Sequence, residues 1–219
     1  MARGGTRRRR TITRRRWSPS PLAMLAFASV AILIGSIAFW LAHPPKPAPR
    51  PKFTMDEARA YNARIPFVSG PLTPAAPFHF HGTPAAREQA VLCLATAALY
   101  EAGDDPRGQA AVIQVVLNRV RVPGFPKTVC GVVYQGSGLT TGCQFSFTCD
   151  GSVARRPEHA GWEAARLEAR RALSGHVFRA VGTATHYHAD WMVPYWIGSL
   201  DKIAKVKSHI FYRPKAPAS

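Results

Sequence analysis

Hydrophobic residues recur at helical spacing from residue 83 onward and predict the first helix of a folded domain. Thr83 is a suitable N-cap, and Pro84 fits the first helical position. The pattern continues to about Ala102, where a glycine and two aspartates interrupt it. The apolar stripe of this helix, which should face the core, consists of Val91, Leu94 and Ala98.

A second helix is expected directly after the polar stretch GDDPRGQ. Asp104 or Asp105 can cap it, Pro106 opens it, and it should end near Arg121. Its sequence AAVIQVVLNRV is apolar on nearly all sides, whereas a surface helix has a single apolar stripe. We therefore expect this helix to be buried at the centre of the domain.

The remaining elements of the domain are shorter. Apolar residues alternate in CQFSFTC, residues 143–149, which predicts a strand or an extended loop. A third helix should run from about Pro157 to Leu173, and short strands are expected in GTATHYHADWMVPYW and SHIFYRP around a helical turn. The sequence thus predicts a helix-rich α+β domain with a small β-sheet over residues 83–215.

Three segments precede this domain. Residues 21–42 contain no charged residue and are long enough, at about 20 apolar residues, to form a transmembrane helix. The basic residues 1–20 should remain cytoplasmic by the positive-inside bias, so that the domain is exported. A cleavable signal peptide is the alternative, but its apolar region would be shorter and would end at a small-residue cleavage site.

Residues 43–82 are expected to link the membrane segment to the domain. The first part, HPPKPAPRPKF, is rich in proline and favours an extended spacer. The second part contains a short helical candidate, MDEARAYNARI, followed by a stretch that proline and glycine interrupt. We expect this second part to lie as a strap against the domain.

The net charge of the chain, +17, is a poor indicator of a nucleic-acid partner because it is unevenly distributed. Residues 1–20 hold eight arginines and no acid, whereas residues 87–215 hold sixteen basic and ten acidic residues. A topogenic signal beside a membrane segment explains both the position and the sign of the N-terminal charge. No nucleic-acid partner is expected.

All four cysteines lie beyond the apolar segment, at Cys93, Cys130, Cys143 and Cys149. Exported proteins retain disulfides, so two bridges are expected, with three possible connectivities. Cys143 and Cys149 would close a short loop, and Cys93 with Cys130 would tie the first helix to a loop after the second. The spacings contain no C-x-x-C pair, which disfavours a zinc site.

The apolar stripe of the first helix continues to an acidic residue, Glu101. An inward-facing carboxyl has its charged form disfavoured by burial, and the negative end of the helix dipole acts in the same direction. The pKa of Glu101 should therefore rise, which is the property that a general acid needs near neutral pH. The alternative is a surface glutamate at a helix end without functional meaning.

Several stretches in unbroken order resemble one family, the SleB-type cell wall hydrolases, in its Gram-negative members. They are LYEAGDDPRGQAAVIQVVLNRV, PGFPKTVCGVVYQG, CQFSFTCDG, ATHYHADWMVPYW and HIFYR, and they cover about residues 83–213. The resemblance implies a fold related to lysozymes and lytic transglycosylases, a peptidoglycan substrate, and a single essential glutamate that aligns with Glu101. With the apolar segment and the basic tail, the chain is expected to be a single-pass inner-membrane protein with a cytoplasmic N-terminus and a periplasmic catalytic domain. The stretch EAGDDPRGQ is one residue shorter than the family pattern, so no catalytic role is carried over from the family to its aspartates.

The reaction depends on whether a second carboxylate assists. Glycosidases that use water normally need two carboxylates, and only Asp150 and Asp190 lie among residues suited to a cleft. Without either, Glu101 would act as acid and then as base while the 6-hydroxyl of muramic acid attacks. That reaction is lytic transglycosylation between N-acetylmuramic acid and N-acetylglucosamine, and it forms a 1,6-anhydro end.

Aromatic and polar residues near the last strands are candidates for sugar binding, because flat faces with polar edges suit pyranose rings. An aromatic core cluster is the equal alternative. His186, His188 and Asp190 could instead bind a metal, but a further ligand at a recognisable spacing is missing, so no metal and no cofactor are expected. The substrate-binding candidates are Gln144, Tyr187, His188, Trp191, Tyr195 and Trp196.

Two other functions remain open from the sequence. One is an exported metal-dependent amidase that uses His186 and His188 on the peptide stem. The other is an inactive glycan-binding module that tethers the membrane to the wall. In each case we expect a monomer whose main partner is the glycan strand of peptidoglycan.

Overall fold

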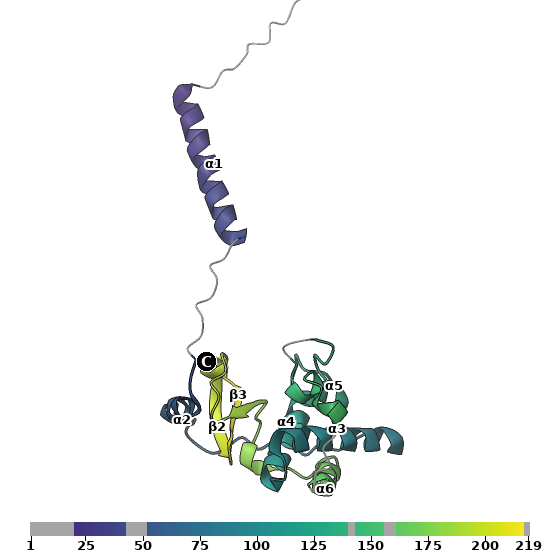
Figure 1. The fold of residues 1–219 in the computed structure, drawn as a ribbon. Coiled ribbons are helices and arrows are strands. Elements are labelled where there is room, and N and C mark those ends of the chain that lie inside the picture. Colours follow the sequence, from purple (N-terminus) through teal and green to yellow (C-terminus); the bar gives the residue numbers. More distant parts are fainter. Residues whose placement is uncertain (1–19, 43–51, 140–142, 156–160, 217–219) are drawn as a thin grey trace, which may run out of the picture. The chain divides into compact units, whose positions relative to one another are not determined.

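The computed structural model describes residues 20–42, 52–139, 143–155 and 161–216. The chain divides into two compact units, and the second begins at Lys52 (Figure 1). Its helices and strands are α2 (Met55–Arg64), α3 (Pro84–Ala102), α4 (Pro106–Arg121), α5 (Val129–Val133), α6 (Trp162–Ala172), β1 (His186–Ala189), β2 (Leu200–Val206) and β3 (His209–Pro214), with short 3-10 helices at Ser146–Thr148, Ser152–Arg155, Arg179–Val181 and Ile197–Ser199.

The first unit contains one described helix, α1 (Pro21–Ala42), at the segment where a membrane span was expected. In the described part of the chain, no helix is both long enough and apolar enough to cross a bilayer. The expectations for the basic tail and for most of the proline-rich spacer fall on residues 1–19 and 43–51, outside the described residues.

The two central helices have the predicted limits because their ends are specified locally. Thr83 caps α3 by accepting a hydrogen bond from the amide of Ala86, and Gly103 ends it with a positive φ of 55°. Asp105, one of the two candidates, caps α4 through the amide of Arg107. Most residues of α4 are buried, as its sequence predicts.

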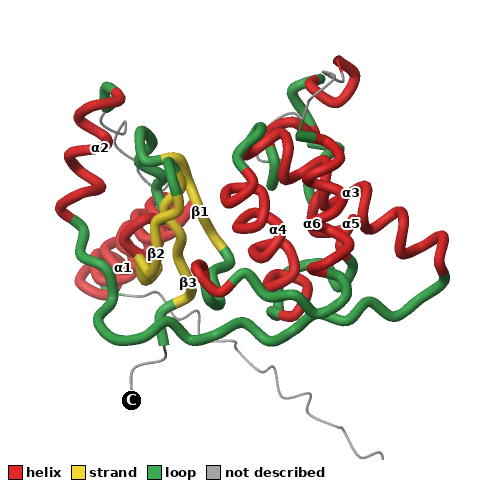
Figure 2. Tube along the Cα trace, turned by 90° about the horizontal axis from the view of Figure 1, so that it is seen from below, coloured by secondary structure: helices red, strands yellow, loops and turns green. Residues whose placement is uncertain are grey.

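The sheet has the order β1–β3–β2, and both pairings are antiparallel. Figure 2 shows it between α2 on one side and α4 on the other. Phe211 faces the α4 side with Ala111 and Val115, whereas its neighbours Ile210 and Tyr212 face the α2 side with Tyr61. This alternation determines which side chains of β1 can reach the helices.

Strand β2 was not predicted, because lysines interrupt its apolar pattern. Lys202 is only 5% exposed, although lysine is rarely buried. Its ammonium donates to the carbonyls of Asn62 and Ile65, at 2.7 and 2.8 Å, where α2 ends. The buried lysine thus holds α2, part of the expected strap, against the sheet.

Residues 143–149 were predicted to be extended, and the structure contradicts this. They contain a 3-10 turn at Ser146–Thr148. Cys143 and Cys149 are bonded to each other with their Cα atoms 6.3 Å apart, whereas an extended run of this length would span about 20 Å. The alternation of apolar residues therefore marks two phenylalanines buried by a closed loop, Phe145 and Phe147.

The third predicted helix is present as α6. The structure has α6 beginning at Trp162 and ending at Ala172, close to the expected end. The expected start at Pro157 falls in residues 156–160, outside the described residues.

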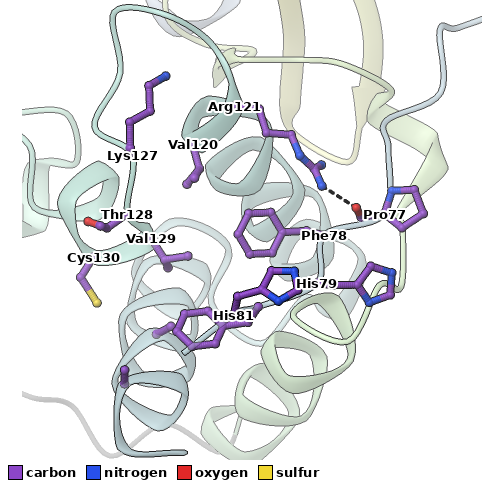
Figure 3. Close-up of a pocket in the computed structure, with 13 residues that line it drawn as sticks. Pro77, Phe78, His79, His81, Val120, Arg121, Lys127, Thr128, Val129 and Cys130 are labelled. Carbon is purple, nitrogen blue, oxygen red and sulfur yellow. Dashed lines mark hydrogen bonds between the residues drawn. The ribbon is translucent and has the colours of Figure 1, made fainter. Parts of the chain in front are cut away.

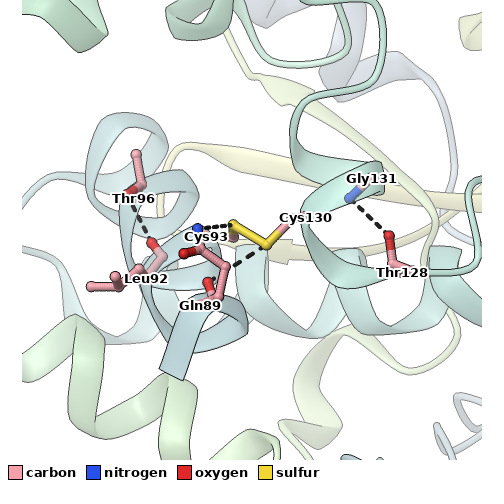
Figure 4. The surroundings of a disulfide bond; sticks show 7 residues. All are labelled: Gln89, Leu92, Cys93, Thr96, Thr128, Cys130 and Gly131. Carbon is pink, nitrogen blue, oxygen red and sulfur yellow. Dashed lines mark hydrogen bonds between the residues drawn. A yellow bond between two sulfur atoms is a disulfide. The ribbon is translucent and has the colours of Figure 1, made fainter. Parts of the chain in front are cut away.

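The second disulfide joins Cys93 of α3 to Cys130 of α5 (Figure 4). It closes a loop across a sequence separation of 37 residues. The pairing observed is therefore one of the three connectivities that the sequence left open, and no cysteine is free.

Candidate active site

Glu101 lies in the last turn of α3, where the predicted apolar stripe of the helix reaches its end. The preceding members of the stripe, Val91, Leu94 and Ala98, are fully buried, so Glu101 faces the same way. Its own side chain is partly buried. The structure therefore places the carboxyl at the margin of the core, where a proton-transfer group needs to be.

Burial is the largest influence on this carboxyl and raises the pKa of Glu101 above its ordinary value of 4.5. Two neighbours oppose the rise in this pKa: a hydrogen bond from the hydroxyl of Tyr187 and the positive charge of Arg119. Burial also raises the pKa of Tyr187, so its hydroxyl keeps its proton and donates to the carboxylate form. The site thus contains one acid with a favoured neutral form and two groups that support its anion.

Tyr187 comes from β1, on the face of the sheet that packs against α4. Its ring lies against Phe211 and His209, with centroids 5.7 and 5.4 Å away. Alternation along β1 directs His186 and His188 to the opposite face. Tyr187 is therefore the β1 side chain that reaches Glu101.

Arg119 is a buried cation beside this acid, only 3% exposed. Its Nε donates to the carbonyl of Thr185 at 2.6 Å, and its guanidinium lies 5.4 and 5.6 Å from the ring centroids of Phe125 and Phe145. Burial lowers the pKa of Arg119 to about 10, so the group stays charged at neutral pH. The sequence analysis missed this residue, and the only signal was an arginine within a helix predicted to be buried.

Gln144, a predicted substrate ligand, lies next to Arg119. With the amide oriented so that its oxygen faces the donors, that oxygen accepts hydrogen bonds from Nη1 and Nη2 of Arg119, each at 3.2 Å. The loop that carries Gln144 also stacks Phe147 on Tyr100, with ring centroids 4.7 Å apart. Tyr100 precedes Glu101, so the disulfide-closed loop packs directly beside the acid.

The other predicted sugar ligands do not gather around Glu101. His188 and Trp196 lie on the far face of the sheet, and His188 is 6% exposed there. Its Nδ1 donates to the carbonyl of Ala189, and its Nε2 accepts from the hydroxyl of Tyr212. Trp191 and Tyr195 follow β1 in an exposed loop, and Tyr195 is 75% exposed. Of the six candidates, the structure brings only Tyr187 and Gln144 into the surroundings of Glu101.

The histidines and Asp190 have protein partners of their own. Burial and the charge of Arg119 lower the pKa of His186 to about 4, and its Nδ1 lies 2.9 Å from the hydroxyl of Thr185. Burial alone would raise the pKa of Asp190, but its ion pairs with Lys205 and Arg59, at 2.7 and 3.3 Å, together outweigh burial and lower this pKa. Within the described ranges no group of three possible metal ligands occurs.

We expect Glu101→Gln to stabilise the protein increasingly as pH rises above about 4.5. The folded wild type keeps the Glu101 proton to higher pH than the unfolded chain, so its free energy of unfolding falls through that window, by about 1.4 kcal/mol per unit of pKa difference. Glutamine does not titrate and removes this loss. Urea denaturation between pH 4 and pH 8 measures the difference, and a difference that stays constant with pH would contradict the raised pKa.

Residues 103–212 match the family described as Cell Wall Hydrolase. The spore cortex-lytic enzyme of Halalkalibacterium halodurans is 34% identical over 120 residues, which are 54% of this chain and 33% of that protein. The spore cortex-lytic enzyme of Bacillus subtilis is 31% identical over 120 residues, 54% of this chain and 35% of that protein. The chain thus spans about a third of the length of these curated relatives.

Two solved structures are similar. The catalytic domain of the germination-specific lytic transglycosylase SleB from Bacillus anthracis has 29% identity and a TM-score of 0.48, and the match covers 61% of this chain and 99% of that one. The catalytic domain of the Bacillus cereus SleB protein has 29% identity and a TM-score of 0.46, with 62% and 95% covered. The family match begins two residues after Glu101, so the role of Glu101 stays a prediction. Because that match spans half of the chain, the chain belongs to the Cell Wall Hydrolase family, and the prediction of a cell wall hydrolase is confirmed.

Proposed function

We propose that this protein cleaves the glycan strands of peptidoglycan between N-acetylmuramic acid and N-acetylglucosamine by lytic transglycosylation. The observation that carries the proposal is the partly buried carboxyl of Glu101, whose pKa is raised by burial and which lies beside Tyr187 and Arg119. Membership of the Cell Wall Hydrolase family supports the substrate. Relatives of the chain are named spore cortex-lytic enzymes, and a lytic activity agrees with cleavage of a wall polymer.

In the first step, protonated Glu101 gives its proton to the oxygen that bridges the two sugars, and the bond from this oxygen to C1 of muramic acid breaks. The resulting carboxylate stabilises the positive charge that develops on the muramic ring. It also accepts the hydrogen bond of Tyr187 and faces the charge of Arg119. These two groups favour the anion at the stage where the acid has lost its proton.

In the second step, the same carboxylate removes the proton from the 6-hydroxyl of muramic acid. The oxygen attacks C1 and closes the 1,6-anhydro ring, and Glu101 returns to its neutral form. One acid is sufficient because the proton that it gives away comes back. Burial keeps the pKa of Glu101 raised, so the acid holds its proton before the first step. Tyr187 and Arg119 stabilise the carboxylate that forms between the first and second steps.

Two other acids that could have assisted have partners of their own. Lys205 and Arg59 hold Asp190 in ion pairs, and neither belongs to the group formed by Glu101, Tyr187 and Arg119. The carboxylate of Asp150 accepts the amide hydrogen of Ser152 at 2.7 Å within its own turn. These contacts favour the single-acid mechanism over one with two carboxylates.

Digestion of purified sacculi by the full chain tests the proposed function. Anhydro-muropeptides that persist in chelator are the expected products. Reducing muramic ends would indicate hydrolysis by water instead, and loss of activity in chelator would favour the amidase. Sedimentation with sacculi without any released product would favour a wall tether.

We propose further that the domain acts outside the cytoplasm, in the periplasm. The two disulfides support this location, because such bridges persist in oxidising compartments and are rare in the cytosol. Fractionation of cells that produce the full chain tests the location, and recovery of the fully reduced protein from the cytosol would contradict it.

Arg119→Met should shift the basic limb of the pH profile of kcat/KM to higher pH. Arg119 lowers the pKa of Glu101, so removing its charge raises that pKa further, and the acid stays protonated to higher pH. Arg119→Lys keeps the charge and should keep the limb close to that of the wild type. The control is Arg107→Met, in the exposed first turn of the same helix. If folded Arg119→Met protein had the same basic limb of the kcat/KM profile as the wild type, Arg119 would have no part in setting the pKa of Glu101.

A further inference from the structure

A buried asparagine of α4 holds the main chain that leads into strand β1. Asn118 is 6% exposed, and its amide nitrogen donates to the carbonyls of Gly182 and Ala184, at 2.9 and 2.8 Å. Its oxygen accepts a hydrogen bond from Gln114, one turn earlier on the same helix, at 3.0 Å. Both hydrogens and the oxygen of this amide are therefore used, and β1 begins two residues after Ala184.

A second buried asparagine holds the main chain that leaves β1. Asn62 of α2 is 2% exposed, and its amide nitrogen donates to the carbonyls of Asp190 and Met192, at 2.7 and 2.9 Å. Within the described residues, the side-chain oxygen of Asn62 has no hydrogen-bond partner. A buried oxygen without a partner costs free energy, and an apolar side chain would avoid this cost. The two donors are therefore what an amide provides at this position.

The two asparagines are placed evenly about Tyr187. Each donates to two carbonyls that are two residues apart, and Tyr187 lies three residues after Ala184 and three residues before Asp190. A slide of β1 along its own axis would break these four hydrogen bonds. A slide of one residue would also turn His186 or His188 toward α4 in place of Tyr187.

The helices that carry the two asparagines are joined by the strap, residues 54–82. Arg121, three residues after Asn118 on α4, donates to the carbonyls of Ala76 and Pro77 in the strap. Figure 3 shows the contact with Pro77 beside a pocket that the strap forms with the end of α4. The two asparagines therefore hold β1 relative to one connected frame, and this frame includes α3, which follows the strap directly.

We propose that Asn118 and Asn62 are positioning residues, which hold β1 at the register where the hydroxyl of Tyr187 donates to the carboxylate of Glu101. They act through Tyr187, whose hydrogen bond lowers the pKa of Glu101. The inference rests on the proposed function for the use of this carboxylate, but the placement of Tyr187 can be tested without any cleavage.

The pKa of Glu101 in the full chain, measured by ¹³C NMR titration of its side-chain carboxyl, tests this placement. Tyr187→Phe removes the hydrogen bond to the anion and should raise this pKa by about 0.5–1. Asn118→Leu and Asn62→Leu remove the donors that hold β1, and each should raise this pKa by at least about half as much. In the Tyr187→Phe background neither leucine variant should raise it further, because the hydroxyl that they place is absent.

Leu173→Ala is the control for a general loss of stability. Leu173 is buried where α6 ends, so its truncation destabilises the fold but should leave the pKa of Glu101 unchanged. If either leucine variant were folded and kept the pKa of the wild type, the proposal would be overturned. An undiminished rise in the Tyr187→Phe background would overturn it as well. Should Asn118→Leu fail to fold, Asn62→Leu decides, because it leaves α4 intact.

A second measurement follows the basic limb of the pH profile of kcat/KM on purified sacculi. Tyr187→Phe, Asn118→Leu and Asn62→Leu should move this limb to higher pH, and Leu173→Ala should not. A raised pKa of Glu101 with an unmoved limb would contradict Glu101 as the acid and leave the placement of Tyr187 supported. If the wild type released nothing from sacculi, the proposed function would fail, whereas the NMR titration would still decide whether the two asparagines place Tyr187.

Discussion

Glu101→Gln is expected to reduce the release of anhydro-muropeptides by at least about 100-fold, since general acid catalysis contributes about 10²–10⁴ in rate. Glutamine has nearly the same shape and can still accept the hydrogen bond of Tyr187, but it has no proton to give to the bridging oxygen. It also cannot remove the proton of the 6-hydroxyl. Both steps of the proposed mechanism are lost with one atom exchanged, and the variant should remain folded.

Glu163→Gln is the matched control for this loss. Glu163 is also a helical glutamate with an arginine partner, Arg166, but its side chain is 73% exposed on α6. Its replacement should leave the rate within about twofold, in line with the small contribution of surface ion pairs. If folded Glu101→Gln protein released product at the rate of the wild type, another residue would have to carry the proton and the proposed mechanism would be wrong.

The limits of α3 and α4 were predictable because residues at the helix ends determine them locally. Thr83 and Asp105 cap their helices through side-chain hydrogen bonds, and Pro84 and Pro106 occupy first positions. These signals depend on a few neighbouring residues and not on the rest of the chain. Strand β2 lacked such a signal, because its buried Lys202 makes sense only when α2 supplies carbonyls from 140 residues away in the sequence.

The inward orientation of Glu101 was predictable for the same reason, since the apolar stripe of α3 leads to it. The partners of Glu101 were not. Whether Tyr187 or its neighbours on β1 reach Glu101 depends on which face of the strand meets α4, and a shift of one residue would have exchanged them. Arg119 reads as a helix-end cation in the sequence, and only the packing of Phe125 and Phe145 around it reveals a buried charge.

Removing the bridge between Cys93 and Cys130 by the double Cys→Ser change is expected to cost about 4 kcal/mol of unfolding free energy, against about 2 kcal/mol for the bridge between Cys143 and Cys149. The difference follows from loop length, because the first bridge closes a separation of 37 residues and the second a separation of 6. Urea denaturation of the two double variants measures both costs, each variant serving as the control for the other.

The ranking should reverse for cleavage. The shorter loop carries Gln144, Phe145 and Phe147, which contact Arg119 and Tyr100 beside Glu101. The longer bridge instead joins Cys130 of α5 to Cys93, eight residues before Glu101 on α3. At a temperature where both variants are folded, the variant without the shorter bridge should therefore release less product from purified sacculi. If the two variants lost stability and activity in the same order, the disulfide-closed loop would have no part in holding the cation that supports the Glu101 carboxylate.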